Sequence, residues 1–536
     1  MTALEDSQFE SAGPEPDASP REAAGTIFRS ILFHRREDGK KAEAAEAPDF
    51  LADLNLDQIV AAVISGKEEY NLAPFFHLPL SDVDAVAFRQ EVMRELENAR
   101  LFADIKAFAL SMRTVRANLA ELGKRYSEHQ KERWFLDAVN GYGDAVHRLA
   151  RDLSAAELDS RGLRGFSAYV SRYASSKRLA LLVEEAKRLL AELAEIRYSV
   201  LIRGAQVEVR RYAGDPDYSA EVEASFERFR QGAVEEYSFR FNDSLEMNHI
   251  EARILEGVAR LHRDVFSRLE SYRAANADFL DPAVVAFDRE IQFYVAYLDY
   301  IAPLKEAGLN FCYPRVSESD KEIYDEEGFD LALAGKLAGE SARPVCNDFY
   351  LRGPERIIVV SGPNQGGKTT FARSFGQLHY LAGLGCPVPG TRAQLYLCDR
   401  IFTHFDREEH MATLRGKLED DVVRIHDILE AATPRSIVII NEIFSSTALR
   451  DGIFLSKEIA SAIMELDVPC VWVTFIEEIA SLSEKTVSMV STVAPDNPAE
   501  RTFKIVRRPA DGLAYAMSLA EKHRLTYDMI KARVRS

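Results

Sequence analysis

A glycine-rich segment followed by lysine and threonine is the strongest chemical signal in the chain. Residues 362–369 read G-P-N-Q-G-G-K-T, the spacing of a phosphate-binding loop. Glycines let backbone N–H groups turn toward a phosphate, the lysine adds positive charge, and the threonine hydroxyl faces Mg²⁺. The residues predicted to bind a nucleotide here are Gly362, Pro363, Asn364, Gln365, Gly366, Gly367, Lys368, Thr369 and Thr370.

The residues on either side of this segment supply the elements that such a loop needs. The apolar, β-branched run 357–360 predicts a buried strand, and residues 370–381 predict a helix. A glycine-rich turn in some other α/β sheet is the alternative. The strand before the loop and the helix after it favour nucleotide binding.

The sequences of several segments resemble those of the MutS family, the DNA-clamp ATPases of mismatch repair and related pathways. The resemblance is strong over residues 343–536 and weaker over the helical middle of the chain. It rests on the doubled glycine with Lys-Thr-Thr in the loop and on these segments: Val345-Cys346-Asn347-Asp348, Cys398-Asp399-Arg400-Ile401-Phe402-Thr403, Asn441-Glu442-Ile443 and Asp451-Gly452.

The resemblance assigns roles to residues outside the loop. It implies that Val345 and Asn347 lie in the adenine-binding segment, and that Asn441 stands where the family has an aspartate that helps to hold Mg²⁺. An asparagine still bonds a metal-bound water but lacks the negative charge. Glu442 is the predicted general base and Lys368 the catalytic cation. The alternative is that Glu442 only ends the strand 436–440.

The resemblance also implies a composite site, completed by a partner subunit. The residues predicted to act across that interface are Gly416, Lys417, Ser446 and Asp451. Gly416 replaces the family's serine, and Phe475 replaces a histidine that follows Thr474. These departures leave ATP or ADP binding intact and predict slow hydrolysis at most.

Composition sets the broad class. The 536 residues are 47% hydrophobic and 28% charged, with a net charge of −18. There is no apolar run of about 18 residues and no secretory signal in the acidic N-terminus. The five cysteines show no CxxC pair, which predicts reduced thiols in a cytoplasmic protein. The acidic charge argues against strong non-specific DNA binding.

The chain divides into three parts, and we predict an α+β multidomain fold. Residues 1–47 are expected to be a mostly disordered tail, apart from the apolar patch 27–33. Residues 48–342 are expected to form a long all-α lever domain. Residues 343–536 are expected to form an α/β P-loop (ABC-type) ATPase domain with a C-terminal helix-turn-helix that braces a dimer.

Within the lever, apolar residues recur at helical spacing, for example from Ile250 to Leu269. Residues 198–212 instead alternate around Arg203-Gly204, which predicts an inserted β-hairpin. Arg203, Arg210 and Arg211 make its tip and one edge basic. By analogy with the family they are candidate DNA contacts, and a solvated hairpin is the equal alternative.

The resemblance implies an ATP-switched clamp on mismatched, branched or otherwise distorted DNA, in a homodimer or in a heterodimer with a related chain. We find no mismatch-reading segment, so we expect a divergent member that does not use the family's wedge. The second hypothesis is a nucleotide-binding scaffold with little ATPase activity that engages protein partners. A P-loop kinase or a transporter subunit fits less well, because the chain has a long helical body and no LSGGQ-like run.

Overall fold

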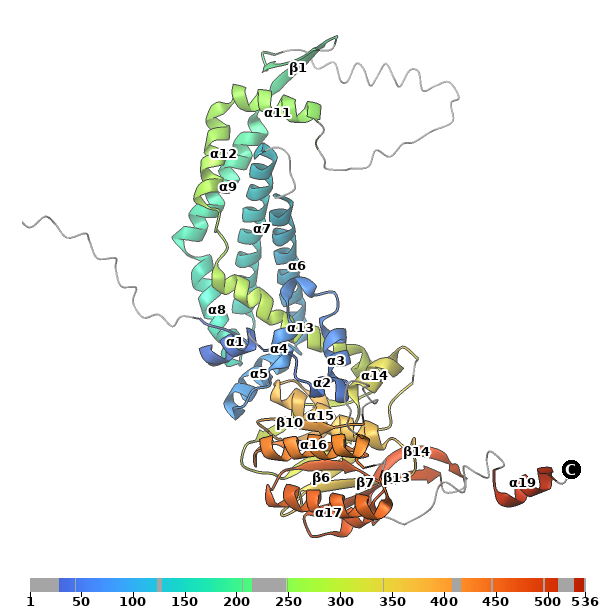
Figure 1. The fold of residues 1–536 in the computed structure, drawn as a ribbon. Coiled ribbons are helices and arrows are strands. Elements are labelled where there is room, and N and C mark those ends of the chain that lie inside the picture. The colour runs from blue at the N-terminus through green and yellow to red at the C-terminus, as the bar shows by residue number, and fades with distance from the viewer. Residues whose placement is uncertain are drawn as a thin grey trace, which may run out of the picture.

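The computed structural model describes residues 28–43, 45–122, 128–204, 206–214, 247, 249–340, 342–406, 416–444, 447–494, 497–509 and 525–534. The molecule is elongated. A body of long helices rises from an α/β base, and a small hairpin projects from the far end of that body (Figure 1). Of the described helices, none is long and apolar enough to cross a membrane.

The helical body consists of antiparallel helices that bury apolar stripes. On α6, Ile105, Phe108, Met112 and Val115 lie at three- and four-residue steps and are all buried, as an amphipathic helix requires. The helices of the body are α6 (Ala99–Leu122), α7 (Glu128–Ala155), α8 (Arg161–Ala174), α9 (Lys177–Glu195), α11 (His249–Leu261), α12 (Arg263–Ala275) and α13 (Pro282–Glu306).

Two details of the body depend on local chemistry. The apolar stripe from Ile250 to Leu269 is split between α11 and α12, because His262 leaves the helical conformation. The return helix α13 begins at Asp281, whose carboxylate accepts hydrogen bonds from the backbone N–H groups of Ala283 and Val284. That N-cap fixes where the chain turns back toward the base.

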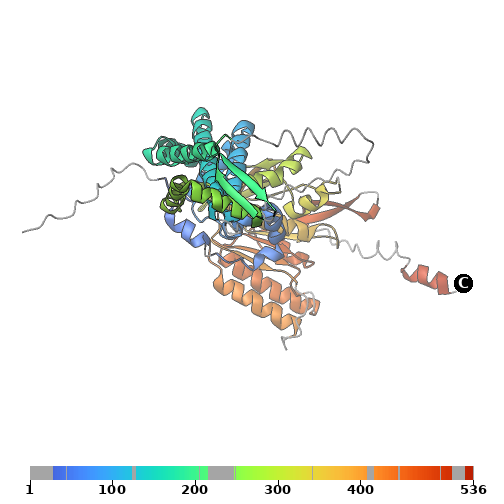
Figure 2. The ribbon, with the colours of Figure 1, turned by 90° about the horizontal axis from the view of Figure 1, so that it is seen from above.

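The hairpin at the far end joins β1 (Tyr198–Arg203) to β2 (Gln206–Arg211) in an antiparallel pair. Seen along the body it extends across the helix tips (Figure 2). Its attachment is to α11, where Val209 packs against Gly257 and the Arg211 guanidinium donates to the carbonyl of Leu261 at 2.6 Å. Arg211 therefore uses at least one of its hydrogen-bond donors within the protein.

The base is built on a six-stranded sheet in the order β10-β11-β12-β7-β13-β14. All neighbours are parallel except β13 and β14, which are antiparallel. The central strands β7, β11 and β12 are almost wholly apolar, as strands covered on both faces must be. Their bounds are β7 (Ile357–Ser361), β10 (Ile401–His404), β11 (Ile437–Asn441), β12 (Cys470–Val473), β13 (Thr486–Ala494) and β14 (Asn497–Arg507).

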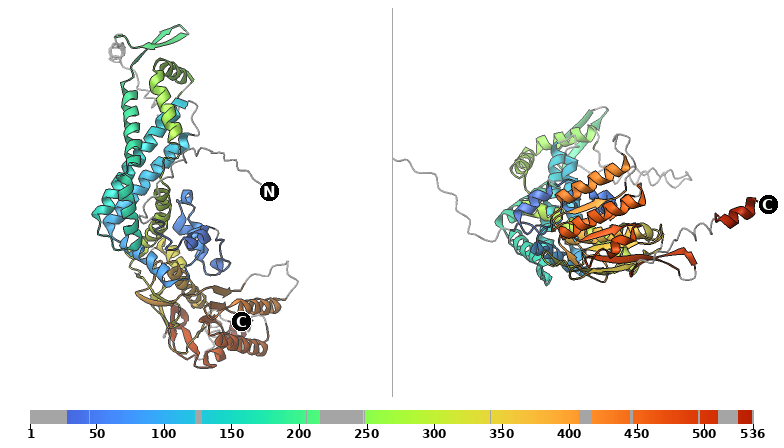
Figure 3. Two further views of the ribbon diagram at one scale, coloured as in Figure 1. Left: turned by 90° about the vertical axis from the view of Figure 1, so that its left-hand side faces the viewer. Right: turned by 60° about the horizontal axis from the view of Figure 1, so that its bottom comes forward.

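Helices cover both faces of this sheet. On one face α15 (Lys368–Gly383) joins the core that continues into the helical body. On the other face α16 (Lys417–Ala431) and α17 (Leu449–Glu465) form a second cluster with the short helix η2 (Glu477–Ser481). In the right-hand view of Figure 3, α16 and α17, in orange, run side by side along one face of the strands.

A second sheet of four strands, in the order β4-β9-β5-β6, lies beside the first. Here β5 pairs with β6 and β9, so residues before and after position 343 share one sheet. The predicted boundary near 343 cuts through this sheet, and the pairing favours a boundary between α13 and β3. The remaining elements of the base are β3 (Phe311–Cys312), β4 (Arg315–Ser317), β5 (Ile323–Gly328), α14 (Leu331–Ala338), β6 (Asn347–Leu351), β8 (Val388–Pro389), β9 (Arg392–Tyr396) and α19 (Tyr527–Val534).

Residues 28–95, called the strap below, connect the base to the body. Ile31 and Leu32 are fully or almost fully buried, and the Arg89 guanidinium donates to the carbonyls of Leu32 and Leu384. The docking segment lies in the expected apolar patch, but helix α1 falls within the tail that composition predicted to be mostly disordered. The elements here are α1 (Arg36–Glu43), α2 (Phe50–Asp53), α3 (Leu56–Ile64), η1 (Glu68–Tyr70), α4 (Ala73–His77) and α5 (Val83–Glu95).

The strap carries a titratable contact that predicts a pH dependence. The Glu290 carboxylate accepts from the backbone N–H of Ile31 at 2.9 Å, and burial raises the pKa of Glu290 to about 7, against the opposing hydrogen bonds and Arg89. Because the folded-state pKa lies above the ordinary value, this group stabilises the fold most at low pH. That contribution is lost as the pH rises from about 4.5 to about 7.

Glu290→Gln, which keeps an acceptor but cannot ionise, should therefore flatten the fall of the urea-unfolding midpoint between pH 5 and pH 8. Glu306→Gln on the exposed side of the same helix is the matched control and should follow the parent. Parallel curves for the parent and Glu290→Gln would contradict the assignment.

Candidate functional site

The candidate site forms where the carboxyl ends of neighbouring parallel strands meet, as is usual in such sheets. Strand β7 leads into residues 362–367, called the glycine loop here, and then into α15. Gly362 and Gly367 have φ of 117° and 88°, which favour glycine. A Cβ on Gly366 would lie 2.3 Å from Ser491 Oγ. The glycine spacing is thus demanded by both backbone conformation and close packing.

Lys368 points its ammonium group back over the glycine loop. Its Nζ donates to the carbonyls of Gly362 and Pro363, both at 3.1 Å, and lies 3.8 Å from Glu442 Oε1. Burial lowers the pKa of Lys368, while the Glu442 carboxylate acts in the opposite direction. A buried cation beside a glycine loop that leads into a helix N-terminus is an arrangement that attracts an anion.

Thr369 and Asn441 meet beside this lysine. The Thr369 hydroxyl donates to Asn441 Oδ1 at 2.9 Å, which brings the last residue of β11 against the first turn of α15. Two neutral oxygens suit Mg²⁺ that keeps most of its water ligands. The donor set fits the metal, without the negative charge that an aspartate would add.

Glu442 follows directly and has a left-handed backbone, with φ of 56°. Its N–H donates to the carbonyl of Val473 at 2.9 Å, and the next turn is tied by Phe444 N–H to the buried Asp421 carboxylate. Such strain persists only where the surroundings enforce it. The strain turns the Glu442 side chain toward the lysine rather than along the strand.

These residues border a cavity of about 490 Å³, within the range of small-molecule sites. Leu333 and Leu337 of α14 and Val345 contribute apolar side chains to its lining. The residues that line it are Gly328, Phe329, Asp330, Leu333, Leu337, Arg343, Pro344, Val345, Asn347, Gln365, Gly366, Gly367, Lys368, Thr369, Thr370, Phe371, Ser374, Glu442 and Phe503.

Several residues of the cavity could not be picked out from sequence. The β13–β14 hairpin braces the glycine loop: Ser491 Oγ donates to Gly366 O at 2.6 Å and Arg501 Nε to Asn364 O at 3.2 Å. Phe503, from the same hairpin, lines the cavity with a φ of 58°. No local pattern marks these residues, because their pairing with the loop is set by the sheet order.

Asn347 lines the cavity and also holds neighbouring segments together. Its amide donates to the carbonyls of Val345 and Phe503, and its Oδ1 accepts from Ile505 N–H at 2.8 Å. The side chain thus ties the Val345 segment to β14. Asn347 lines the cavity mainly as a residue that positions its neighbours.

The residues predicted to act across a subunit interface do not line this cavity. Gly416 caps α16 and is open to solvent, and Lys417 is paired with Asp406 at 2.9 Å. Asp451 is exposed in the first turn of α17. Ser446 lies outside the described residues. Arg203 and Arg210 are far away, on the exposed surface of the hairpin.

Comparison with known proteins finds similarity to MutS proteins. The family model described as MutS domain V matches residues 358–532, which begin at β7 and include the glycine loop and Glu442. "DNA mismatch repair protein MutS" of Erythrobacter litoralis is 29% identical over 372 residues, covering 66% of this chain and 40% of that protein.

Two further relatives carry the same name. The protein of Synechococcus elongatus is 26% identical over 75% of this chain and 43% of its own length. The protein of Solibacter usitatus is 28% identical over 45% of this chain and 27% of its own length. The chain thus spans about two fifths or less of the length of these relatives.

The matched model covers the glycine loop, Glu442 and Phe503, whereas α14 and the Val345 segment of the cavity precede it. The relatives extend the likeness into the helical body. The chain is thus similar to MutS proteins over residues 358–532 and over part of the helical body.

Proposed function

We propose that the chain is an ATP-binding, slowly hydrolysing DNA clamp, in which nucleotide in the cavity switches the grip of the helical body on DNA. One observation carries the nucleotide part of the proposal. Lys368, Thr369 and Glu442 line one cavity together with the apolar side chains of Leu333, Leu337, Val345 and Phe503. A lining that combines a cation, a hydroxyl and a carboxylate with apolar side chains suits a ligand that has both phosphates and a base.

The residues divide accordingly. The glycine loop and Lys368 hold the phosphates of ATP or ADP, and the base lies between Val345 and Phe503. Mg²⁺ is held by Thr369 and, through water, by Asn441, and it would balance phosphate charge during hydrolysis. Glu442 accepts a proton from the attacking water.

A dimer is part of this proposal. Exposed apolar side chains gather beside the phosphate end: Leu449 and Phe454 on α17 are 71% and 63% exposed, and Phe475 is 51% exposed. Surface of this kind is typical of an interface. A second copy, or a related chain, would cover it and bring Gly416, Lys417, Ser446 and Asp451 toward the nucleotide. The C-terminal residues around α19 would brace the pair as a helix-turn-helix, most of which lies outside the described residues.

The DNA part of the proposal rests on shape and relationship. Long helices connect the base to a hairpin whose tip carries Arg203 and whose second strand carries Arg210. The relatives are named as DNA mismatch repair proteins. We place distorted duplex between two such bodies, with the hairpins against phosphates.

A nucleotide-binding scaffold with little turnover is the second candidate. It is favoured by Asn441, which brings no charge to the metal, and by Phe475, whose ring faces Lys368. In that case the helical body would bind protein partners.

The test is the ATPase rate with no DNA and with homoduplex, mismatched, four-way-junction and single-stranded DNA. Stimulation by one structure, absent in Lys368→Ala, is the result expected for a clamp. A rate equal to that of Lys368→Ala with every DNA, while nucleotide still binds the parent, would overturn the clamp in favour of the scaffold.

A further inference from the structure

Phe475 lies directly against the functional end of Lys368. The Lys368 Nζ is 4.7 Å from the centroid of the Phe475 ring, a cation–π distance. The ring follows strand β12, and the preceding residue is fixed because Thr474 N–H donates to the carbonyl of Val360 at 3.1 Å. The backbone is therefore anchored, while the side chain remains half exposed.

The ammonium group has polar neighbours on its other sides. Its Nζ lies 3.1 Å from the carbonyls of Gly362 and Pro363, 3.4 Å from Asn364 Oδ1 and 3.8 Å from Glu442 Oε1. The Phe475 ring occupies the side of Nζ that faces β12. While the ring stays there, a phosphate cannot approach Lys368 from that side.

A steric estimate makes this concrete. A phosphate oxygen bonded to Nζ at about 2.8 Å on the ring side would come within about 2 Å of the ring centroid. Carbon and oxygen atoms in contact need about 3.5 Å. A phosphate on that side and the ring in its present place exclude each other.

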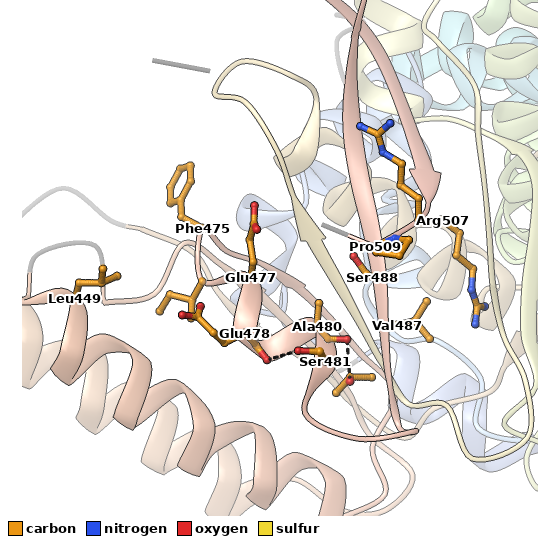
Figure 4. A pocket seen from close by; sticks show the side chains of 13 residues that line it. Leu449, Phe475, Glu477, Glu478, Ala480, Ser481, Val487, Ser488, Arg507 and Pro509 are labelled. Atoms are coloured by element: carbon orange, nitrogen blue, oxygen red, sulfur yellow. Dashed lines mark hydrogen bonds between the residues drawn. The ribbon is translucent and has the colours of Figure 1, made fainter. Parts of the chain in front are cut away.

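The structure also offers the ring another place to go. Phe475 lines a groove of about 970 Å³ beside η2, together with Leu449, Glu477 and Val487. Figure 4 shows Phe475 and Leu449 at one end of this groove and Arg507 at the other. Rotation of one exposed side chain about χ1 would move the ring away from Lys368 without moving the sheet.

We propose that Phe475 determines specificity between nucleotides: a diphosphate binds with the ring over Lys368, whereas a triphosphate binds only when the ring moves into the groove. The inference rests on the proposed nucleotide site and names its regulation. The position of the Phe475 ring would then depend on whether a third phosphate is bound, and it would change the exposed apolar surface that contains Leu449.

The test is the dissociation constant for ADP and for a non-hydrolysable ATP analogue, measured by calorimetry on the full chain. Phe475→Ala should raise the affinity for the ATP analogue about 10-fold relative to ADP, because the triphosphate no longer displaces a cation–π contact. Leu110→Ala, which removes an exposed apolar side chain from α6 in the helical body, is the control and should leave the ratio unchanged.

A second measurement follows the ring itself. Phe475→Trp should change its emission with the ATP analogue and not with ADP, after subtraction of the parent protein with Trp134 and Trp472. An unchanged affinity ratio in Phe475→Ala, or an equal response to both nucleotides in Phe475→Trp, would contradict the proposed role of Phe475. Failure of the parent to bind either nucleotide is a different result, since it would refute the nucleotide site itself.

Discussion

Lys368→Ala should lower the affinity for ATP at least about 100-fold, about 2.7 kcal/mol. The lysine is the buried cation at the glycine loop, and hydrogen bonds to charged groups contribute about 1.5–3 kcal/mol. Its loss would also leave Glu442 without a positive neighbour at the phosphate end. Calorimetric titration of ATP against the purified chain measures the effect.

The matched control is Lys336→Ala, an exposed lysine on α14 that does not line the cavity. It removes the same charge from the same part of the fold and should bind ATP like the parent. Equal affinities for Lys368→Ala and Lys336→Ala would place the phosphates elsewhere. The thermal unfolding midpoint of both variants should be recorded, because a collapsed glycine loop would mimic lost binding.

The candidate site residues could be predicted from sequence where they directly follow a single strand. The glycine loop follows a strand directly, and Asn441-Glu442 follows another, so each pair of strand and loop is visible within about ten residues. The structure brings Lys368, Thr369, Asn441 and Glu442 together because β7 and β11 both flank β12 in the same direction. Parallel neighbours place their carboxyl ends at one edge.

The rest of the cavity depends on contacts between distant residues. Asn347 and Phe503 are 156 residues apart yet share a hydrogen bond. The pairing of β5 with β6 and β9, which joins residues on both sides of the predicted boundary near 343, likewise has no local signature. The family resemblance was confirmed by the matched model and relatives, whereas the roles of the cross-subunit residues stay predictions.

Position 475 illustrates what sequence and structure each contribute. Sequence comparison identified a phenylalanine in place of the family's histidine, which predicted only that a polar function is missing. The structure adds that the ring occupies space next to Lys368 and borders an open groove. If Phe475 only lacks the function of a histidine, Phe475→Ala should not change nucleotide affinity. If the ring blocks a phosphate sterically, Phe475→Ala should raise the affinity for a triphosphate.

Glu442→Gln should keep ATP affinity within about 3-fold of the parent and lower the single-turnover hydrolysis rate by at least about 100-fold, the usual contribution of a general base. The side chain is one-third exposed and 3.8 Å from Lys368, and the strained backbone aims it at the phosphate end of the cavity. The amide retains size and hydrogen bonding but cannot accept the proton of water.

Glu477→Gln serves as the control, since Glu477 lines the neighbouring groove and not the nucleotide cavity. If Glu442→Gln hydrolyses ATP at the parent rate, another group must take the proton.

If the parent itself shows no more hydrolysis than Lys368→Ala, the strained segment at Glu442 must serve a purpose other than ATP turnover. The left-handed Glu442, held by Val473 and by the Asp421 contact to Phe444, would then be a means of sensing bound nucleotide and transmitting it to α16. Single-turnover rates and binding constants measured on the same three variants separate these cases, because a sensor changes affinity and a base changes only rate.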